Sequence, residues 1–109
     1  MKLYIGGAYQ GQEKLARQEN PDGELFERFH ETIRGKVQQE GQDASAFAEK
    51  FCREHPDAVV VSDEVGSGVV PMEAEDRAFR EAVGRVLCVI ARNAEQVTRC
   101  VCEIGVRIK

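Results

Sequence analysis

A glycine-flanked loop near the start of the chain is the first group of residues that could do chemistry. In a phosphate-binding loop of the form GxxxxGK[ST], backbone amides cradle phosphate, the lysine reaches the β- and γ-phosphates, and the hydroxyl ligates Mg²⁺. The two positions that follow the second glycine are here Gln12 and Glu13. The loop amides could still hold an anion, so nucleotide binding and a tight turn without a ligand both remain open. The loop consists of Gly6, Gly7, Ala8, Tyr9, Gln10 and Gly11.

Two acids and two glycines form a second group in the middle of the chain. They follow residues 58–61 (AVVV), an apolar run that predicts a fully buried parallel strand at the centre of a sheet. Because open α/β sheets bind ligands beyond the carboxyl ends of their strands, we expect Asp63, Glu64, Gly66 and Gly68 to form a ligand loop. The two carboxylates could hold Mg²⁺ or a hydroxyl-bearing ligand. The alternative is a solvated turn.

Histidine and arginine side chains supply the remaining candidates. His30 lies in a predicted helix, where it could act as a nucleophile or serve packing as a half-buried side chain. Arg77, Arg80 and Arg85 lie in a later helix, where they could meet phosphate or a neighbouring subunit. Solvation of a charged helix face is the alternative for these arginines.

The elements that must position these residues alternate between strand and helix. Apolar spacing and turn residues predict strands over 2–5, 58–61 and 97–102 and helices over 12–19, 24–40, 44–54 and 73–95, with Asp43 capping the third of these helices. Gly105 separates the last strand from residues 106–109. This order predicts an α/β fold in which helices flank a small, mostly parallel sheet.

Length and composition restrict the classes of protein. A chain of 109 residues fits one domain, 1–109, and a net charge of -4 argues against a general nucleic-acid or membrane-surface binder. No apolar run approaches the roughly 18 residues of a membrane span, and residues 1–5 lead into glycines rather than a signal-peptide core, so we expect a cytoplasmic protein. The four cysteines lack CxxC spacing, which favours reduced core side chains over a zinc site.

Four segments in conserved order resemble the adenosylcobinamide kinase/adenosylcobinamide-phosphate guanylyltransferase family of cobalamin biosynthesis. Residues 3–11 (LYIGGAYQG) are similar to the family's first strand and loop, and residues 60–71 (VVSDEVGSGVVP) to its V-S-N-E-V-G-x-G-I-V-P segment, with Asp63 in place of the usual asparagine. Residues 77–85 (RAFREAVGR) resemble its R-x-F-R-[DE]-x-x-G-R helix, and residues 104–109 (IGVRIK) its I-P-L-R-[LI]-K end. Family members are commonly longer, so the resemblance is to a shortened, divergent member.

The resemblance implies a truncated P-loop-NTPase-like fold of three layers and two reactions. These are kinase chemistry, in which GTP or ATP with Mg²⁺ phosphorylates adenosylcobinamide, and nucleotidyltransferase chemistry, in which GMP moves from GTP through a guanylyl-histidine. His30 is the candidate for that histidine. The implied partners are nucleotide, cobinamide and further copies of the chain in a homo-oligomer. Because Gln12 and Glu13 depart from the motif, we expect a nucleotide-binding protein, with catalysis left open. The alternative is a noncatalytic nucleotide- or corrinoid-binding or regulatory protein.

Overall fold

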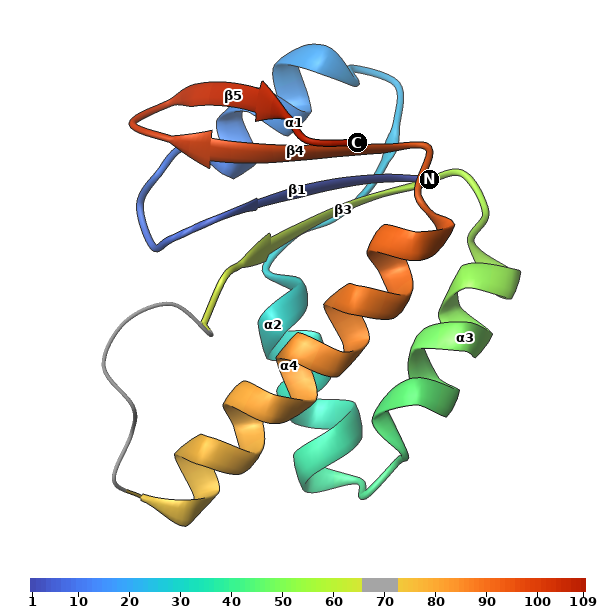
Figure 1. The fold of residues 1–109 in the computed structure, drawn as a ribbon. Helices are drawn as coiled ribbons and strands as arrows, with labels where there is room; N and C mark the ends of the chain where they lie inside the picture. The colour runs from blue at the N-terminus through green and yellow to red at the C-terminus, as the bar shows by residue number, and fades with distance from the viewer. Residues whose placement is uncertain (66–72) are drawn as a thin grey trace.

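Five strands form one sheet in the order β2-β3-β1-β4-β5 (Figure 1). The computed structural model describes residues 1–65 and 73–109. Four strands run parallel, and β5 pairs antiparallel with β4 at one edge. The middle strand is therefore β1, and the buried strand expected at the centre lies beside it. The strands are β1 (Lys2–Gly6), β2 (Glu24–Phe26), β3 (Ala58–Asp63), β4 (Gln96–Val101) and β5 (Ile104–Arg107).

Helices cover both faces of the sheet, so the fold has the three layers that the family resemblance implies. One face carries α1 (Gln12–Glu19), and the other carries α2 (Phe29–Ile33), the π-helix η1 (Arg34–Gln39), α3 (Ala44–Glu54) and α4 (Ala74–Asn93) (Figure 1). No helix within the described residues is long and apolar enough to cross a membrane. The α/β class with a small, mostly parallel sheet is confirmed.

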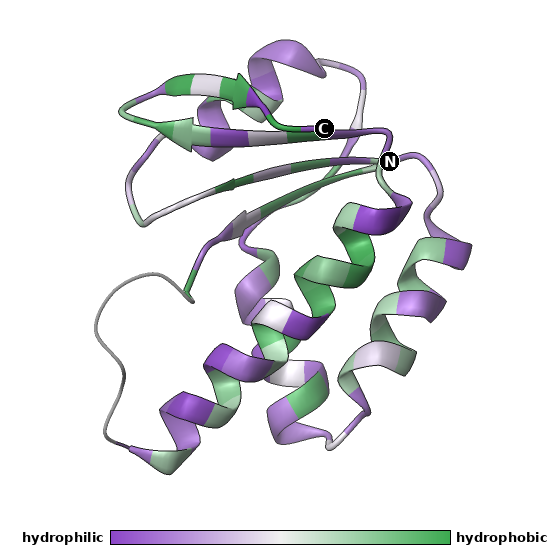
Figure 2. Ribbon diagram, viewed as in Figure 1, coloured by the Kyte–Doolittle hydropathy of each residue, from purple (hydrophilic) through white to green (hydrophobic). Residues whose placement is uncertain are grey.

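Burial on both faces explains the uninterrupted apolar run of β3. Ala58 and Val60 face the large core beneath α2 to α4, whereas Val59 and Val61 face a smaller cluster beneath α1. Side chains alternate between faces along a strand, so a strand covered on both sides must be apolar throughout. Figure 2 shows the same asymmetry in the helices, since α1 is mostly hydrophilic and α4 carries hydrophobic turns next to the sheet.

The helix start predicted at Asp43 is confirmed by its hydrogen bond. The Asp43 carboxylate accepts from the backbone N–H of Ala46 at 2.9 Å, which satisfies one of the amides that a helix start leaves unpaired. The bounds of α1 and α3 agree with those predicted, and α4 agrees within two residues at either end.

The single helix predicted over residues 24–40 is wrong. Its first residues form β2, which pairs parallel with β3, and Arg28 then takes a left-handed conformation (φ 50°) before α2 and η1 begin. The pairing with β3 satisfies the backbone groups on one side of β2, and the Phe26 ring packs edge-on against Phe51 with centroids 4.9 Å apart. Helical spacing misled because Phe26 of β2 and the residues Phe29 and Ile33 of α2 pack on the same large core from different elements, whereas Leu25 packs on the smaller cluster under α1.

The end of the chain also differs from the prediction. The strand predicted over 97–102 is β4, which ends at Val101. A two-residue turn joins β4 to β5 in a hairpin that the sequence did not predict. Both turn residues, Cys102 and Glu103, have positive φ values of 51° and 65°. Asparagine and glycine usually mark such a turn, and neither stands here, so the sequence carried no sign of the hairpin.

Candidate functional site

The glycine loop joins β1 to α1 at the carboxyl edge of the sheet. A Cβ at Gly6 would come within 2.6 Å of the Cys100 carbonyl oxygen, so only glycine fits this strand end. Gly11 has φ 87°, and a Cβ there would lie 2.8 Å from the Glu103 side chain. The Tyr9 side chain is fully exposed. The loop thus has the strand, tight turn and helix that phosphate binding requires.

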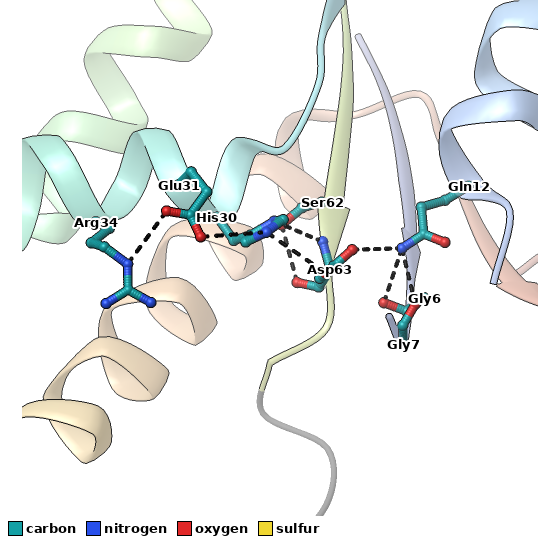
Figure 3. A network of polar contacts seen from close by, with 8 residues as sticks. All are labelled: Gly6, Gly7, Gln12, His30, Glu31, Arg34, Ser62 and Asp63. Carbon is teal, nitrogen blue, oxygen red and sulfur yellow. Dashed lines mark hydrogen bonds and ion pairs between the residues drawn. The ribbon is translucent and has the colours of Figure 1, made fainter. Parts of the chain in front are cut away.

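Gln12, which stands where the motif has lysine, is buried. Its Nε2 donates to the carbonyl oxygens of Gly6 (3.3 Å) and Gly7 (3.1 Å) and to Asp63 Oδ1 (2.8 Å), as Figure 3 shows. All three are acceptors, which fixes the nitrogen end of the amide toward them. The opposite atom, Oε1, is buried without a hydrogen-bond partner in the described part of the chain. A neutral amide therefore ties the loop to β3.

Asp63 links that amide to His30 on the far side of β3. Its Oδ1 accepts from Gln12, and its backbone N–H donates to His30 Nδ1 at 3.2 Å (Figure 3). An Nδ1 that accepts is unprotonated, so the neutral ring carries its proton on Nε2. This Nε2 lies 3.7 Å from Asp63 Oδ2 and 3.8 Å from Glu31 Oε1. Three residues from three elements thus meet at the end of β3.

The two predicted metal ligands have different partners. The Glu64 backbone N–H donates to the Gly6 carbonyl at 2.7 Å, while its carboxylate lies 3.8 Å from Arg99 Nε. The described residues contain no group of three or more His, Cys, Asp or Glu side chains that could hold a metal ion. Mg²⁺ bound to a nucleotide needs only one or two protein carboxylates, because phosphates and water supply its other ligands. The half-buried Asp63 could supply such an oxygen.

An open hollow of about 520 Å³ lies beside the loop, between α1 and the end of β3. Three cations and three acids line it: Lys14, Arg17, Arg28, Glu13, Asp63 and Glu103. Glu103 lies 3.6 Å from Lys14 Nζ, and Glu27 accepts hydrogen bonds from Arg17, which raises the pKa of that guanidinium. Arg28 is exposed, and sequence reasoning missed it because it stood inside a predicted helix. An anion in the hollow would therefore meet cations of which two are already paired.

The remaining candidates do not line this hollow. Arg77, Arg80 and Arg85 lie on α4, where Arg85 Nη2 bonds Glu81 one turn away at 2.6 Å. Gly66 and Gly68 lie outside the described residues. The expected ligand loop is therefore described only as far as Val65.

The C-terminal hairpin braces the glycine loop, a contact that the sequence did not indicate. Gln10 Oε1 accepts from the Cys102 N–H at 2.7 Å, and the Gln10 carbonyl accepts from the Glu103 N–H at 2.8 Å. The turn of the hairpin thus supplies donors to the loop from 92 positions away.

A family model described as cobinamide kinase / cobinamide phosphate guanyltransferase matches residues 11–108. The match spans nearly the whole chain, and the chain belongs to this family. Its range includes Gln12, His30 and Asp63 and begins at the last glycine of the loop. No curated protein matches the sequence. Membership connects the chain with cobalamin biosynthesis and with the nucleotide and cobinamide chemistry of the family.

Proposed function

We propose that this family member binds a nucleoside triphosphate, GTP or ATP, against the Gly6–Gly11 loop and does so without transferring a phosphoryl group. The observation that carries the proposal is the buried Gln12 amide, which bonds the carbonyls of Gly6 and Gly7 and the carboxylate of Asp63. It keeps the loop closed onto β3 without any cation. The loop amides remain available to phosphate oxygens, as in other anion-binding turns.

Charge argues for binding and against transfer. A lysine beside the β- and γ-phosphates neutralises charge that builds up in phosphoryl transfer, and Gln12 has no charge to offer. Glu13 places a carboxylate where the motif has a Mg²⁺-binding hydroxyl. At an effective dielectric constant near 20, a negative charge about 4 Å from a phosphate oxygen raises the energy of the bound nucleotide by roughly 4 kcal/mol. Of the three cations that line the hollow, Lys14 and Arg17 are paired with Glu103 and Glu27, so Arg28 is the one that offsets this repulsion for a bound anion.

The arrangement of His30 supports the same conclusion for guanylyl transfer. A histidine that attacks phosphorus needs a ring nitrogen with a free lone pair directed at the nucleotide. The Nδ1 lone pair accepts from Asp63 N–H, the side chain is 9% exposed, and His30 does not line the hollow. In this arrangement His30 orients Asp63, and Asp63 in turn orients Gln12.

Calorimetric titration with GTP, ATP and cobinamide, each with and without Mg²⁺, tests the proposal. We expect a triphosphate to bind in the micromolar range and radiolabelled GTP to leave no label on the protein. Absence of triphosphate binding would contradict the proposal, and heat from cobinamide alone would favour a corrinoid-binding protein. Labelling that disappears in His30→Ala would restore the transferase assignment.

A double substitution tests the part played by the loop itself. Gln12→Lys combined with Glu13→Ser adds the lysine and removes the misplaced carboxylate, while Asp63 compensates the buried lysine. We expect triphosphate affinity to rise at least tenfold, which corresponds to about 1.4 kcal/mol. The control is Gln18→Lys combined with Gln39→Lys, two exposed positions outside the loop, which adds the same two positive charges. Equal gains in both proteins would mean that the loop does not contact the nucleotide.

A further inference from the structure

Backbone strain is concentrated around the hollow beside the glycine loop. Within residues 1–65 and 73–109, four residues other than glycine have a positive φ: Tyr9, Arg28, Cys102 and Glu103. Three of them line the hollow, and Cys102 directly precedes Glu103. A residue with a Cβ adopts this conformation at a cost in energy, and such strain is found most often at sites that bind a ligand. The side chains held in this way are those that a ligand in the hollow would meet.

Among these residues, Glu103 has the best-defined position. Its backbone N–H donates to the Gln10 carbonyl at 2.8 Å, and its side chain packs on Gly11, since a Cβ at Gly11 would come within 2.8 Å of Glu103 Cγ. The φ of Glu103 is 65°, and glycine is the residue type that best suits the second position of such a turn. A glutamate in its place brings a negative charge to the start of α1, beside the glycine loop.

This charge neutralises one of the cations of the hollow. The Glu103 carboxylate lies 3.6 Å from Lys14 Nζ, and both side chains are exposed, 64% and 62%, so the pair is weak and can exchange its partners. An anion that enters the hollow must draw Lys14 away from Glu103. The carboxylate then stays near the anion without its partner, and the repulsion between them grows with the charge of the anion.

Charge in the hollow as a whole is balanced. The three acids that line it equal the three cations in number, so a ligand gains little attraction from each further negative charge that it carries. Without Glu103 the cations would be in excess, and Lys14 would have no acid beside it in the hollow. Glu103 is therefore the side chain whose removal should make affinity depend on the charge of the ligand.

We propose that Glu103 is a specificity-determining residue that makes the hollow bind nucleoside diphosphates and triphosphates with similar affinity. The inference rests on the proposed function, because it concerns a nucleotide bound against the Gly6–Gly11 loop. The terminal phosphate of a triphosphate adds negative charge, and the repulsion from Glu103 offsets the attraction from Lys14. The loop then recognises the phosphates that both nucleotides share. A repulsive group directed against one ligand is a general means of setting specificity.

Removal of the carboxylate tests the proposal. Calorimetric titration with GTP and with GDP, at one Mg²⁺ concentration and one ionic strength, gives two dissociation constants for each protein. In the unmodified chain we expect them to agree within about twofold. In Glu103→Gln we expect GTP to bind about fivefold more tightly than GDP, the effect of a unit charge about 4 Å away in water. The variant keeps the backbone hydrogen bond to Gln10 and the part of the side chain that packs on Gly11.

Glu54→Gln is the matched control. Glu54 also forms an exposed ion pair with a lysine, since its carboxylate lies 3.8 Å from Lys50 Nζ and the side chains are 55% and 66% exposed. It lies on α3 and does not line the hollow. Its loss changes the net charge by the same amount and should leave the ratio of the two dissociation constants unchanged. The same change of ratio in both variants would overturn the proposal, because net charge alone would then explain it.

Lys14 provides a second measurement on the same proteins. Lys14→Gln should weaken GTP binding by less than about twofold in the unmodified chain, where Glu103 already pairs with the lysine. In Glu103→Gln the same substitution should weaken GTP binding about fivefold, because the lysine there is available to phosphate. Equal losses in the two backgrounds would show that the pair does not compete with the nucleotide, and would overturn the proposal.

A second variant separates the charge from the strain of the turn. Glu103→Asn also removes the carboxylate, and asparagine suits a left-handed backbone better than glutamine does. Both variants should show the same preference for GTP. Weaker GTP binding in either variant would overturn the proposal, since Glu103 would then contact the ligand directly. If the unmodified chain binds GTP and neither variant changes the ratio, this inference alone fails. If neither the unmodified chain nor any variant binds GTP, the proposed function fails with it.

Discussion

The face of the sheet under α2, α3 and α4 buries a continuous apolar core, whereas the face under α1 buries a small cluster beside paired polar groups. The larger core draws residues from all four helical segments of its layer and from β1, β3 and β4. The smaller one consists of Tyr4, Ala16, Val59, Val61 and Cys100. The glycine loop, Gln12 and the Asp63 carboxylate belong to the smaller face. The comparison indicates that one face supplies most of the stability and that the other can hold polar groups in defined positions.

The polar groups of the smaller face are satisfied locally. The Tyr4 hydroxyl donates to Glu19 Oε1 at 2.6 Å and accepts from Asn20 Nδ2 at 3.0 Å, and Lys2 Nζ donates to Asn20 Oδ1 at 3.1 Å. Burial, and then the Glu19 carboxylate, raise the pKa of Tyr4 to about 12. These bonds fasten the end of α1 to the first strand, while Gln12 fastens its beginning.

The largest expected effect is on the larger face. Ile90→Ala should lower the free energy of unfolding by about 2–5 kcal/mol, because Ile90 is fully buried and leaves a cavity. Triphosphate affinity of the folded protein should not change. Urea denaturation and calorimetric titration measure the two quantities. Leu87→Ala, a half-buried position one turn earlier in α4, serves as the control and should cost less. Equal costs would mean that the larger core is loosely packed.

A smaller loss of stability is expected at the junction of the two faces. Asp63→Ala should cost about 1–3 kcal/mol, because the buried Gln12 amide and His30 both lose a partner. Asp63→Asn should retain most of the stability, since its carbonyl oxygen can still accept from Gln12. Urea denaturation gives both values. The neighbouring Glu64→Ala should stay within about 0.5 kcal/mol of the unmodified chain. If Asp63→Ala cost no more than that, the network would not hold the loop.

The smallest expected effect is that of the Tyr4 hydroxyl. Tyr4→Phe should cost about 1–2 kcal/mol at neutral pH, because the Glu19 carboxylate loses its donor. The folded chain holds the proton of the Tyr4 hydroxyl more tightly than the unfolded chain, in which the pKa of this hydroxyl is near 10.0. Stability from this group is complete below pH 10 and falls as the pH rises from 10 to about 12. The difference between the two proteins in urea denaturation should shrink over that range; a constant difference would contradict the pKa shift.

Local signals predicted the elements on which this comparison rests. The AVVV run indicated a strand buried on both faces, and Asp43 indicated the start of α3, because each depends on neighbouring residues alone. β2 could not be predicted in the same way, since its three residues form a strand only by pairing with β3.

The sequence predicted where the candidate site lies in the fold, but not which of its residues hydrogen-bond one another. The sequence indicated that Asp63 follows a buried strand and that the loop ends at Gln12. It did not indicate that the two side chains bond each other, because 51 positions separate them and no local rule relates such residues. His30 contacts Asp63 from a helix whose first residue was wrongly predicted. Arg28 lines the hollow because its backbone is left-handed, a conformation that a continuous helix over 24–40 would not allow.

The two hydrogen bonds between Gln10 and the hairpin turn affect the order in which the chain can fold. Both donors stand 92 or more positions after their acceptor residue, so the loop reaches its final shape only after the last strands have been synthesised and paired. Contacts of such long sequence separation form late, because the chain must first close a large loop. A nascent chain in which only β1 to α4 have left the ribosome would contain the glycines of the site but not the hairpin that bonds Gln10. The ability of the loop to bind an anion would therefore appear last.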